Sequence, residues 1–314
     1  MTTETHPGPR FTRADPIPQH HAVRSPVGRI VSWLALAIVL LIILNTLLHN
    51  DNIHLDVIAR YLFDWRILEG VLGAIALAVV SFVFASVIGV VVGYARVSRN
   101  PVARTASWLY VWFFRSVPLI VFILIFGNFA LFLPKLGIGI PFTDLSFWSV
   151  STNSVLVPMV AGGVALSLEQ GAYLAEIVRA GTQSVSESQR EAAAAMGLSP
   201  WQIERKVVLP QAIPVMIPPA GSTFVLLLKS TSLVYAIAGT EVLGVAEQIA
   251  SQNLATMEML FVASIWYLVL TSLASLGQRY LERRTSAYRR RVRTTDAAVT
   301  AEAATEGDAG ARSA

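Results

Sequence analysis

The sequence predicts an all-α polytopic membrane protein with about six transmembrane helices. Hydrophobic residues make up 54% of the 314-residue chain and charged residues only 14%, whereas charged residues make up about a quarter of an ordinary soluble domain. Mean hydropathy is +0.58. Several apolar runs reach the roughly 20 residues that one helix needs to cross a bilayer. A water-soluble enzyme is therefore not expected, and the absence of cysteine excludes disulfides and thiolate metal sites.

Six apolar runs carry this prediction, and each is long enough for one span. Few charges interrupt them, chiefly Arg115, Glu169, Glu176 and Lys229. The runs cover residues 31–48, 67–94, 106–133, 154–178, 213–234 and 258–276.

The distribution of Lys and Arg predicts the orientation. If both termini are cytoplasmic, eighteen of these residues flank the spans on the inside, and three, Arg60, Arg66 and Lys135, lie outside. Cytoplasmic loops of membrane proteins carry such an excess. The sequence therefore predicts a multi-pass membrane protein with both termini in the cytoplasm. The same rule explains the net charge of +4, so no nucleic acid partner is expected.

The runs also divide the chain. Residues 1–29 and 281–314 are expected to be cytoplasmic tails, the first disordered and the second basic and then disordered, because their composition offers no core. Residues 30–48 are expected to form an anchor helix, since the apolar stretch exceeds the usual length in a cleaved signal peptide. Residues 65–280 form the main transmembrane domain.

Some features inside the runs predict architecture. Pro118 is expected to break the third helix near Arg115, and Glu176 and Arg179 are spaced for an ion pair on one helix face. Small residues of the second run permit close helix approach: Gly70, Gly73, Gly89 and Gly93.

The loop at 181–211 is the one cytoplasmic loop with helix signatures. Ser188 and Glu191 are spaced as a capping box, and Gly197 fits the stop after the alanine run. Ser199, with Pro200 and Gln202 behind it, predicts a second helix that ends before Pro210. The result is a helix, an elbow and a helix. It either transmits force from a soluble partner or merely links two spans.

The spacing in this loop resembles the EAA loop of type I ABC importer permeases. Glu191-Ala192-Ala193, then Gly197, then Val207-Val208-Leu209-Pro210 fit EAA-x3-G-x9-I-x-L-P, with Val207 in place of isoleucine. Other segments resemble the polar amino acid subfamily (the histidine, glutamine, glutamate, arginine and opine type), and the resemblance covers about residues 65–280. These segments start at Tyr110 (YVWFFRSVPL), Gly171 (GAYLAEIVR), Leu209 (LPQA) and Lys229 (KSTSL).

The resemblance implies a type I ABC importer permease bundle that imports a polar amino acid. It implies cytoplasmic ATPase subunits, an extracytoplasmic solute-binding protein and a second permease copy or paralogue as partners, besides membrane lipid. This chain lacks a GxxxxGK[ST] loop. It is therefore expected to be no enzyme and to have no catalytic residues, metal or cofactor of its own, with ATP and Mg held by the partner ATPase. The residues implied to couple to that ATPase are Ser188, Gln189, Glu191, Ala192, Ala193, Gly197, Leu209 and Pro210.

Charged and polar residues in the spans are candidates for the substrate pathway. Glu169 either pairs with the ammonium group of an amino acid or is a structural partner of a neighbouring helix. Lys229 either attracts a substrate carboxylate or extends outward to the membrane surface. The candidate set is Glu169, Tyr173, Lys229, Thr231 and Ser232.

An ion-coupled secondary transporter of a small polar solute is the alternative. Such proteins contain broken helices and acidic residues within the membrane, and Glu169 fits this pattern. The alternative leaves the loop at 181–211 without a role.

Overall fold

A computed structural model describes residues 26–48, 54–139 and 146–311, with side chains described as far as Thr285. The chain divides into two units at Ile53 and His54. The first unit contains α1 (Pro26–Leu48), a 23-residue helix over the predicted anchor. Its described side chains are exposed throughout. Of the tail predicted at 1–29, residues 26–29 belong to α1 instead, and residues 1–25 lie outside the described residues.

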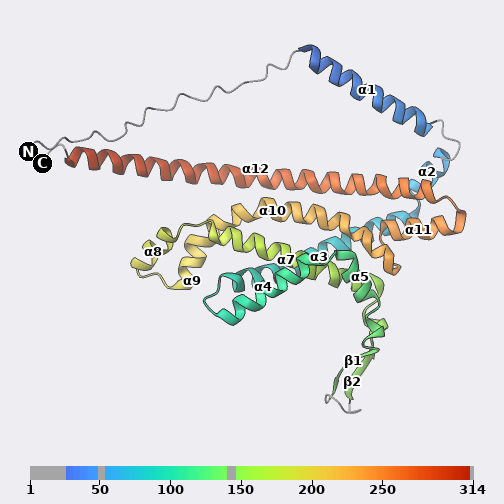
Figure 1. The fold of residues 1–314 in the computed structure, drawn as a ribbon, viewed down its shortest axis with the longest axis horizontal. Coiled ribbons are helices and arrows are strands. Elements are labelled where there is room, and N and C mark those ends of the chain that lie inside the picture. Colours follow the sequence, from blue (N-terminus) through green and yellow to red (C-terminus); the bar gives the residue numbers. More distant parts are fainter. Residues whose placement is uncertain (1–25, 49–53, 140–145, 312–314) are drawn as a thin grey trace, which may run out of the picture. The chain divides into compact units, whose positions relative to one another are not determined.

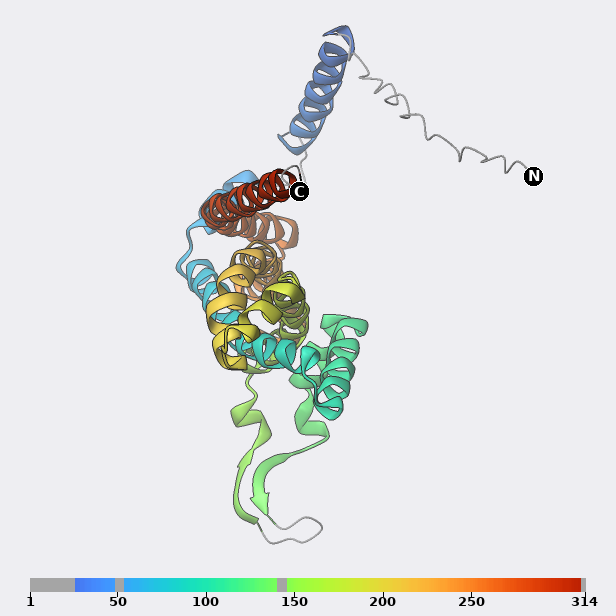
Figure 2. The same cartoon turned by 90° about the vertical axis from the view of Figure 1, so that its left-hand side faces the viewer.

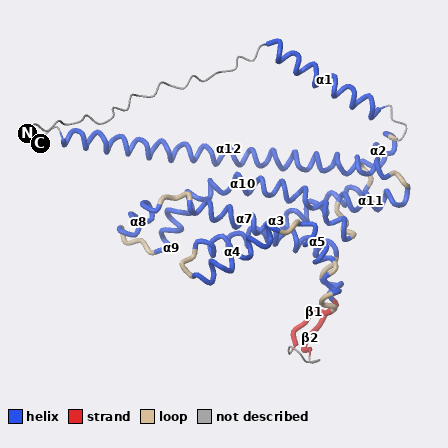
Figure 3. Tube along the Cα trace, in the orientation of Figure 1, coloured by secondary structure: helices blue, strands red, loops and turns tan. Residues whose placement is uncertain are grey.

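The second unit is built of helices with one small sheet (Figures 1 and 3). Its main helices are α3 (Trp65–Val97), α4 (Pro101–Ser116), α5 (Leu119–Gly127), α7 (Pro158–Gln183), α10 (Leu209–Ser230), α11 (Val242–Asn253) and α12 (Thr256–Ala311). Shorter pieces are α2 (Leu55–Leu62), η1 (Phe129–Leu131), α6 (Thr152–Val155), α8 (Glu187–Ala195), α9 (Pro200–Ile203), η2 (Glu204–Val208) and η3 (Thr231–Ile237).

Within the described residues, three helical segments are long and apolar enough to cross a membrane: Trp65–Val97, Pro200–Asn253 and Thr256–Thr285. A fourth is added if α4 and α5, bent by 96° at their junction, form one span. The break at Pro118 confirms the prediction, because proline cannot continue the hydrogen-bond ladder of α4. The chain is therefore a mostly helical, multi-pass membrane protein.

Helix α7 covers the fourth predicted span, yet it is not among these apolar segments. The reason is its position. It packs on α3, α4, α5 and α10, and buried Glu169 and Gln170 replace the apolar surface of a lipid-facing helix. A helix at the centre of a bundle can be less apolar than the helices around it, because protein and not lipid surrounds it.

Small residues allow the closest helix contact in this unit. Gly89 and Gly93 of α3 face Leu174 and Val178 of α7, which confirms the packing role predicted for them. The largest core joins α3, α10, α11 and α12 around Ile67, Leu227 and other buried apolar residues. At the start of α3, Asp64 accepts from the Arg66 amide at 2.9 Å. Its side-chain hydrogen bond with Arg66 lowers the pKa of the Asp64 carboxyl.

The sheet is a departure from the all-α prediction. Strands β1 (Lys135–Gly139) and β2 (Ser146–Ser151) form an antiparallel hairpin with Lys135 opposite Ser151. The hairpin extends away from the helices of its unit (Figures 1 and 2). Leu136 lies opposite Val150, and Ile138 lies opposite Trp148. Apolar alternation over such short segments is too brief to stand out beside the long apolar runs.

The C-terminal helix is also longer than predicted. Helix α12 runs from Thr256 to Ala311 and so includes residues 281–311 of the segment at 281–314, which was expected to be a basic and then disordered tail. Alanine and arginine are the most frequent residues of this segment, and both have high helix propensity, so the helix continues beyond the apolar part.

Candidate functional site

The loop between α7 and α10 folds into two helices around Gly197, as predicted. Gly197 adopts φ +82°, a conformation that costs glycine little. Its amide donates to the Ala194 carbonyl at 2.9 Å, and the Leu198 amide donates to the Ala193 carbonyl at 3.2 Å, so the carbonyls at the end of α8 are satisfied. The Ser199 amide donates to Gln202 Oε1 at 2.9 Å, which confirms the second helix start.

Two details of the loop differ from prediction. Helix α8 begins at Glu187 with Ser186 as its N-cap, so Ser188 lies inside the helix and forms no capping box; its Oγ donates to Ser186 Oγ at 3.2 Å. The second helix does not end before Pro210. It passes through the π-helical turn η2 directly into α10. Pro210 is the second residue of α10, directly after η2, so its missing amide falls where the hydrogen bonding changes from π-helical to α-helical.

The two helices of the loop present an open face. Glu191 and Ala192 are exposed, whereas Ala193 is buried. At the elbow, Met196 is 75% exposed and Trp201 is 68% exposed. Large apolar side chains left this open at the tip of a rigid protrusion are typical of a contact surface for another protein.

Polar contacts hold the loop to two long helices. Arg190 of α8 donates to the Thr182 carbonyl of α7 at 2.6 Å, and its Nη1 lies 3.6 Å from Glu204 Oε2. Tyr94 of α3 donates to Glu204 Oε1 at 2.7 Å. We call Tyr94, Glu204 and Arg190 the strut. Two further contacts join the loop to α10: Gln211 donates to Gln189 Oε1 at 3.0 Å, and Val208 packs with Val185 and Ala212. Hydrogen bonds and an ion pair therefore connect α8 to α7 directly and to α3 through Glu204.

Removing the carboxylate of the strut should loosen the loop. In Glu204→Ala, Arg190 loses a charged partner and Tyr94 loses its acceptor, so amide hydrogen exchange in α8 is expected to rise about tenfold. Glu187→Ala is the matched control, because the Glu187 side chain is 79% exposed and lies 3.9 Å from Arg190. Equal exchange in the two variants, measured by mass spectrometry, would contradict a holding role for the strut.

The residues predicted for the substrate pathway do not form one cluster. Glu169 is buried in α7, and its Oε2 accepts from the side-chain Nε2 of Gln170 at 2.5 Å. Tyr173 lies one turn further along α7, with the Arg115 guanidinium 4.9 Å from its ring centre. Arg115 thus packs on an aromatic face.

The other three residues lie at the end of α10. Lys229 is exposed. Thr231 is buried, donates to the Leu228 carbonyl at 2.8 Å and lies 3.3 Å from the Tyr267 hydroxyl. Ser232 donates to the Lys229 carbonyl at 2.8 Å. Both hydroxyls have hydrogen-bond partners within the helices, and these bonds explain why a threonine and a serine occupy the two positions.

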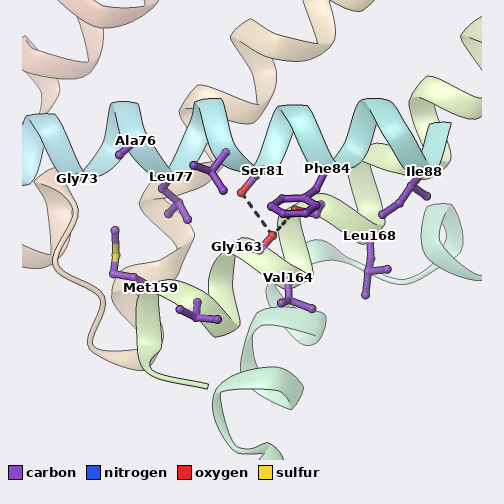
Figure 4. Close-up of a pocket in the computed structure, with 13 residues that line it drawn as sticks. Gly73, Ala76, Leu77, Ser81, Phe84, Ile88, Met159, Gly163, Val164 and Leu168 are labelled. Carbon is purple, nitrogen blue, oxygen red and sulfur yellow. Dashed lines mark hydrogen bonds between the residues drawn. The ribbon is translucent and has the colours of Figure 1, made fainter. Parts of the chain in front are cut away.

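A groove of about 500 Å³ runs between α3 and α7 (Figure 4). Its wall is apolar except for two hydroxyls, Ser81 and Ser167, which both donate to the Gly163 carbonyl, at 3.4 and 2.6 Å. Ser167 and Leu168 line it, but Glu169 does not. The groove contains no charge that would recognise the ammonium or carboxylate of an amino acid.

One partly buried carboxylate outside the loop, Glu176, joins α3 and α7 at the same end of the bundle. Glu176 accepts from Arg179 at 2.9 Å, which confirms the predicted intrahelical pair. Its other oxygen lies 2.8 Å from Arg96 Nη2 of α3, an ion pair without hydrogen-bond alignment. Among the residues that the structure describes, no three His, Cys, Asp or Glu are grouped as metal ligands.

A helical membrane unit with a protruding helix, elbow and helix is the arrangement expected for the permease class of ATP-driven transporters. Residues 85–287 match the family described as binding-protein-dependent transport system inner membrane component. The chain belongs to this family. It is the membrane component of such a system, whose ATP hydrolysis is performed by a partner subunit, and its relatives are amino-acid ABC transporter permeases.

The chain is 36% identical to the arginine transport system permease protein ArgU of Corynebacterium glutamicum, over 90% of this chain and 87% of that one. It is 33% identical to the probable glutamine ABC transporter permease protein GlnM of Bacillus subtilis, over 69% and 92%. Among solved structures, an amino acid ABC transporter crystallised with histidines matches with a TM-score of 0.59 and 26% identity, over 70% and 94%.

Proposed function

We propose that this chain imports a polar amino acid through the bacterial plasma membrane, as part of a complex with six spans per permease chain and both termini in the cytoplasm. Its partners are a cytoplasmic ATPase that holds ATP and Mg, an extracytoplasmic binding protein, and a second permease copy or paralogue. The exposed tip of the loop, anchored to two long helices, is the observation that carries this proposal. A loop with an exposed tip and a fixed base can bind another protein and transmit its movement to the helical bundle.

The coupling residues are those proposed from the sequence, with separate tasks. Ser188, Glu191 and Ala192 are exposed on α8 and meet the ATPase, while Gly197 fixes the elbow. Gln189, Ala193, Leu209 and Pro210 join the loop to α10 or to its own core. When the ATPase subunits close on ATP, α8 moves with them, and the strut passes this movement to α3 and α7. The spans then change from an inward-facing to an outward-facing arrangement, which opens the pathway to the outside of the cell.

Reconstituted uptake tests the proposal. Vesicles that contain the permease and the ATPase from the same gene neighbourhood are supplied with the binding protein. They should accumulate radiolabelled amino acid only when ATP is present on the side of the membrane that carries the ATPase. Vesicles that contain the permease alone should take up none when a proton or sodium gradient is applied. Gradient-driven uptake by the permease alone would establish the ion-coupled secondary transporter instead.

We propose a basic amino acid as the substrate. The similarity to an arginine transport permease supports this, and so does a carboxylate at Glu169, which is favourable beside a cationic group in a low-dielectric site. Tyr173 lies on the same helix one turn away. Lys229 is proposed to line the outer part of the pathway and to attract the substrate carboxylate, while Thr231 and Ser232 hold the backbone beside it through their hydrogen bonds.

Neutralising Glu169 tests whether this carboxylate contacts the substrate. Glu169→Gln keeps the size of the side chain and should raise the KM for arginine uptake about tenfold, because a charged contact is lost, while complex assembly is unchanged. Glu69→Gln is the control, since Glu69 is an exposed acid of α3. Uptake kinetics of Glu169→Gln that equal those of the wild type would remove Glu169 from the pathway and leave it a structural partner of Gln170.

A further inference from the structure

A basic cleft lies where α3, α4 and α7 meet at the end of the bundle that carries the loop. It encloses about 400 Å³ and is lined by Arg96, Arg104, Thr105, Trp108, Arg179 and Gln183. This volume is within the range of small-molecule sites. A second hollow of about 300 Å³ continues from it, shares Arg96 and Trp108, and adds Arg115.

The cleft has more positive charge than its carboxylates neutralise. Glu176 is the acid beside it, and it is shared by Arg96 and Arg179. Arg179 also donates to Gln183 Oε1 at 2.6 Å. Among the described residues, no carboxylate forms an ion pair with Arg104, which leaves its guanidinium donors for a ligand. Three arginines around one carboxylate favour a bound anion, and guanidinium groups match the oxygens of phosphate in particular.

The cleft lies at the depth of a membrane surface. The apolar helix α3 ends at Val97, one residue after Arg96, and α4 begins at Pro101. Trp108 and Trp112 stack with ring centres 6.2 Å apart and are 52% and 54% exposed. Tryptophan is enriched where hydrocarbon meets the polar headgroups. Arginines beside exposed tryptophans at this depth therefore meet headgroups before they meet soluble anions.

We propose that this cleft binds the phosphate of an anionic phospholipid of the cytoplasmic leaflet, with Arg104 and Arg96 on the phosphate oxygens and Trp108 beside the glycerol. The proposal rests on the proposed orientation, which places the cleft in the leaflet where anionic lipids attract basic segments. A bound headgroup would tie α3, α4 and α7 together next to the strut, so membrane composition would affect how firmly the loop is held.

Quenching of tryptophan by brominated lipids tests this on the full chain in vesicles. The contribution of Trp108 is the difference between the wild type and Trp108→Phe. Quenching of the Trp108 fluorescence should show that brominated phosphatidylglycerol associates about fivefold more strongly than brominated phosphatidylcholine. Arg104→Gln should bring the ratio close to one. Arg104→Lys, which retains the charge, and Arg99→Gln, an exposed arginine outside the cleft, should keep most of it.

Three outcomes would overturn the proposal. Equal quenching by the two lipids in the wild type would show that the cleft has no preference for an anionic headgroup. A preference that Arg104→Gln leaves unchanged would place the lipid elsewhere. Displacement of the brominated lipid by millimolar inorganic phosphate, at matched ionic strength, would identify a soluble anion as the ligand. The vesicles contain lipid in both leaflets, so the result does not depend on orientation or on uptake.

Discussion

Replacing Gly89 by leucine is expected to prevent correct folding of the bundle. A Cβ atom at this position would lie 2.5 Å from Leu174 Cβ, 3.1 Å from the Leu174 carbonyl carbon and 3.2 Å from the Ala175 amide nitrogen. Two of these atoms belong to the backbone of α7, so a change of rotamer cannot relieve the contact. Overpacking in a dense core costs about 3 kcal/mol or more, a large part of the stability of an ordinary domain.

Size-exclusion chromatography in mild detergent measures this effect, with a fluorescent fusion to follow the chain. Gly89→Leu should elute as aggregate or fail to accumulate, while Gly89→Ala should show a lower melting temperature. Gly277→Leu is the matched control, because no atom lies within 4 Å of a Cβ built on Gly277 of α12. A symmetrical peak for Gly89→Leu at the wild-type position would show that α3 and α7 are not packed as closely as in this structure.

Positions of the long helices follow from local properties of the chain. Apolar runs determine where α1, α3, α10 and the first part of α12 lie, because each needs only its own residues to satisfy the backbone in lipid. Pro118 predicts the break between α4 and α5 for the same local reason. The angle of that break, 96°, depends on packing of α5 against α7 and η3, which no neighbouring residue in the sequence specifies.

The loop at 181–211 contains both kinds of feature, those set by neighbouring residues and those set by distant contacts. Gly197 and the Ser199–Gln202 pair are short-range features, and spacing predicts them. Glu204 meets Tyr94 across 110 positions of the chain, and Arg190 was assigned no role by sequence reasoning. Glu241 is a similar case. It is fully buried, caps α11 through the Leu243 and Gly244 amides and accepts from Tyr267. A signal existed here, since an acid before a helix in an apolar region needs partners.

Reversing the charge of Glu191 is expected to separate the permease from its ATPase. Glu191 lies on the open face of α8, beside Ala192, where a partner can approach closely. A lysine there would replace a favourable charge by an unfavourable one within a desolvated contact. Such changes cost about 2 kcal/mol or more, which corresponds to association about 30-fold weaker. Co-purification of a tagged ATPase with Glu191→Lys should therefore fail, and ATP-driven uptake should fall to background.

Gly197→Asp should act on the same contact through the backbone. The φ of +82° is unfavourable for aspartate, and nothing lies within 4 Å of a Cβ built on Gly197, so the variant changes the elbow without creating a clash. Weaker co-purification is expected with the bundle still folded. Glu282→Lys on α12 is the control for the change of charge. If both loop variants bind the ATPase and transport as Glu282→Lys does, the loop only connects two spans, and the force that moves the bundle enters elsewhere.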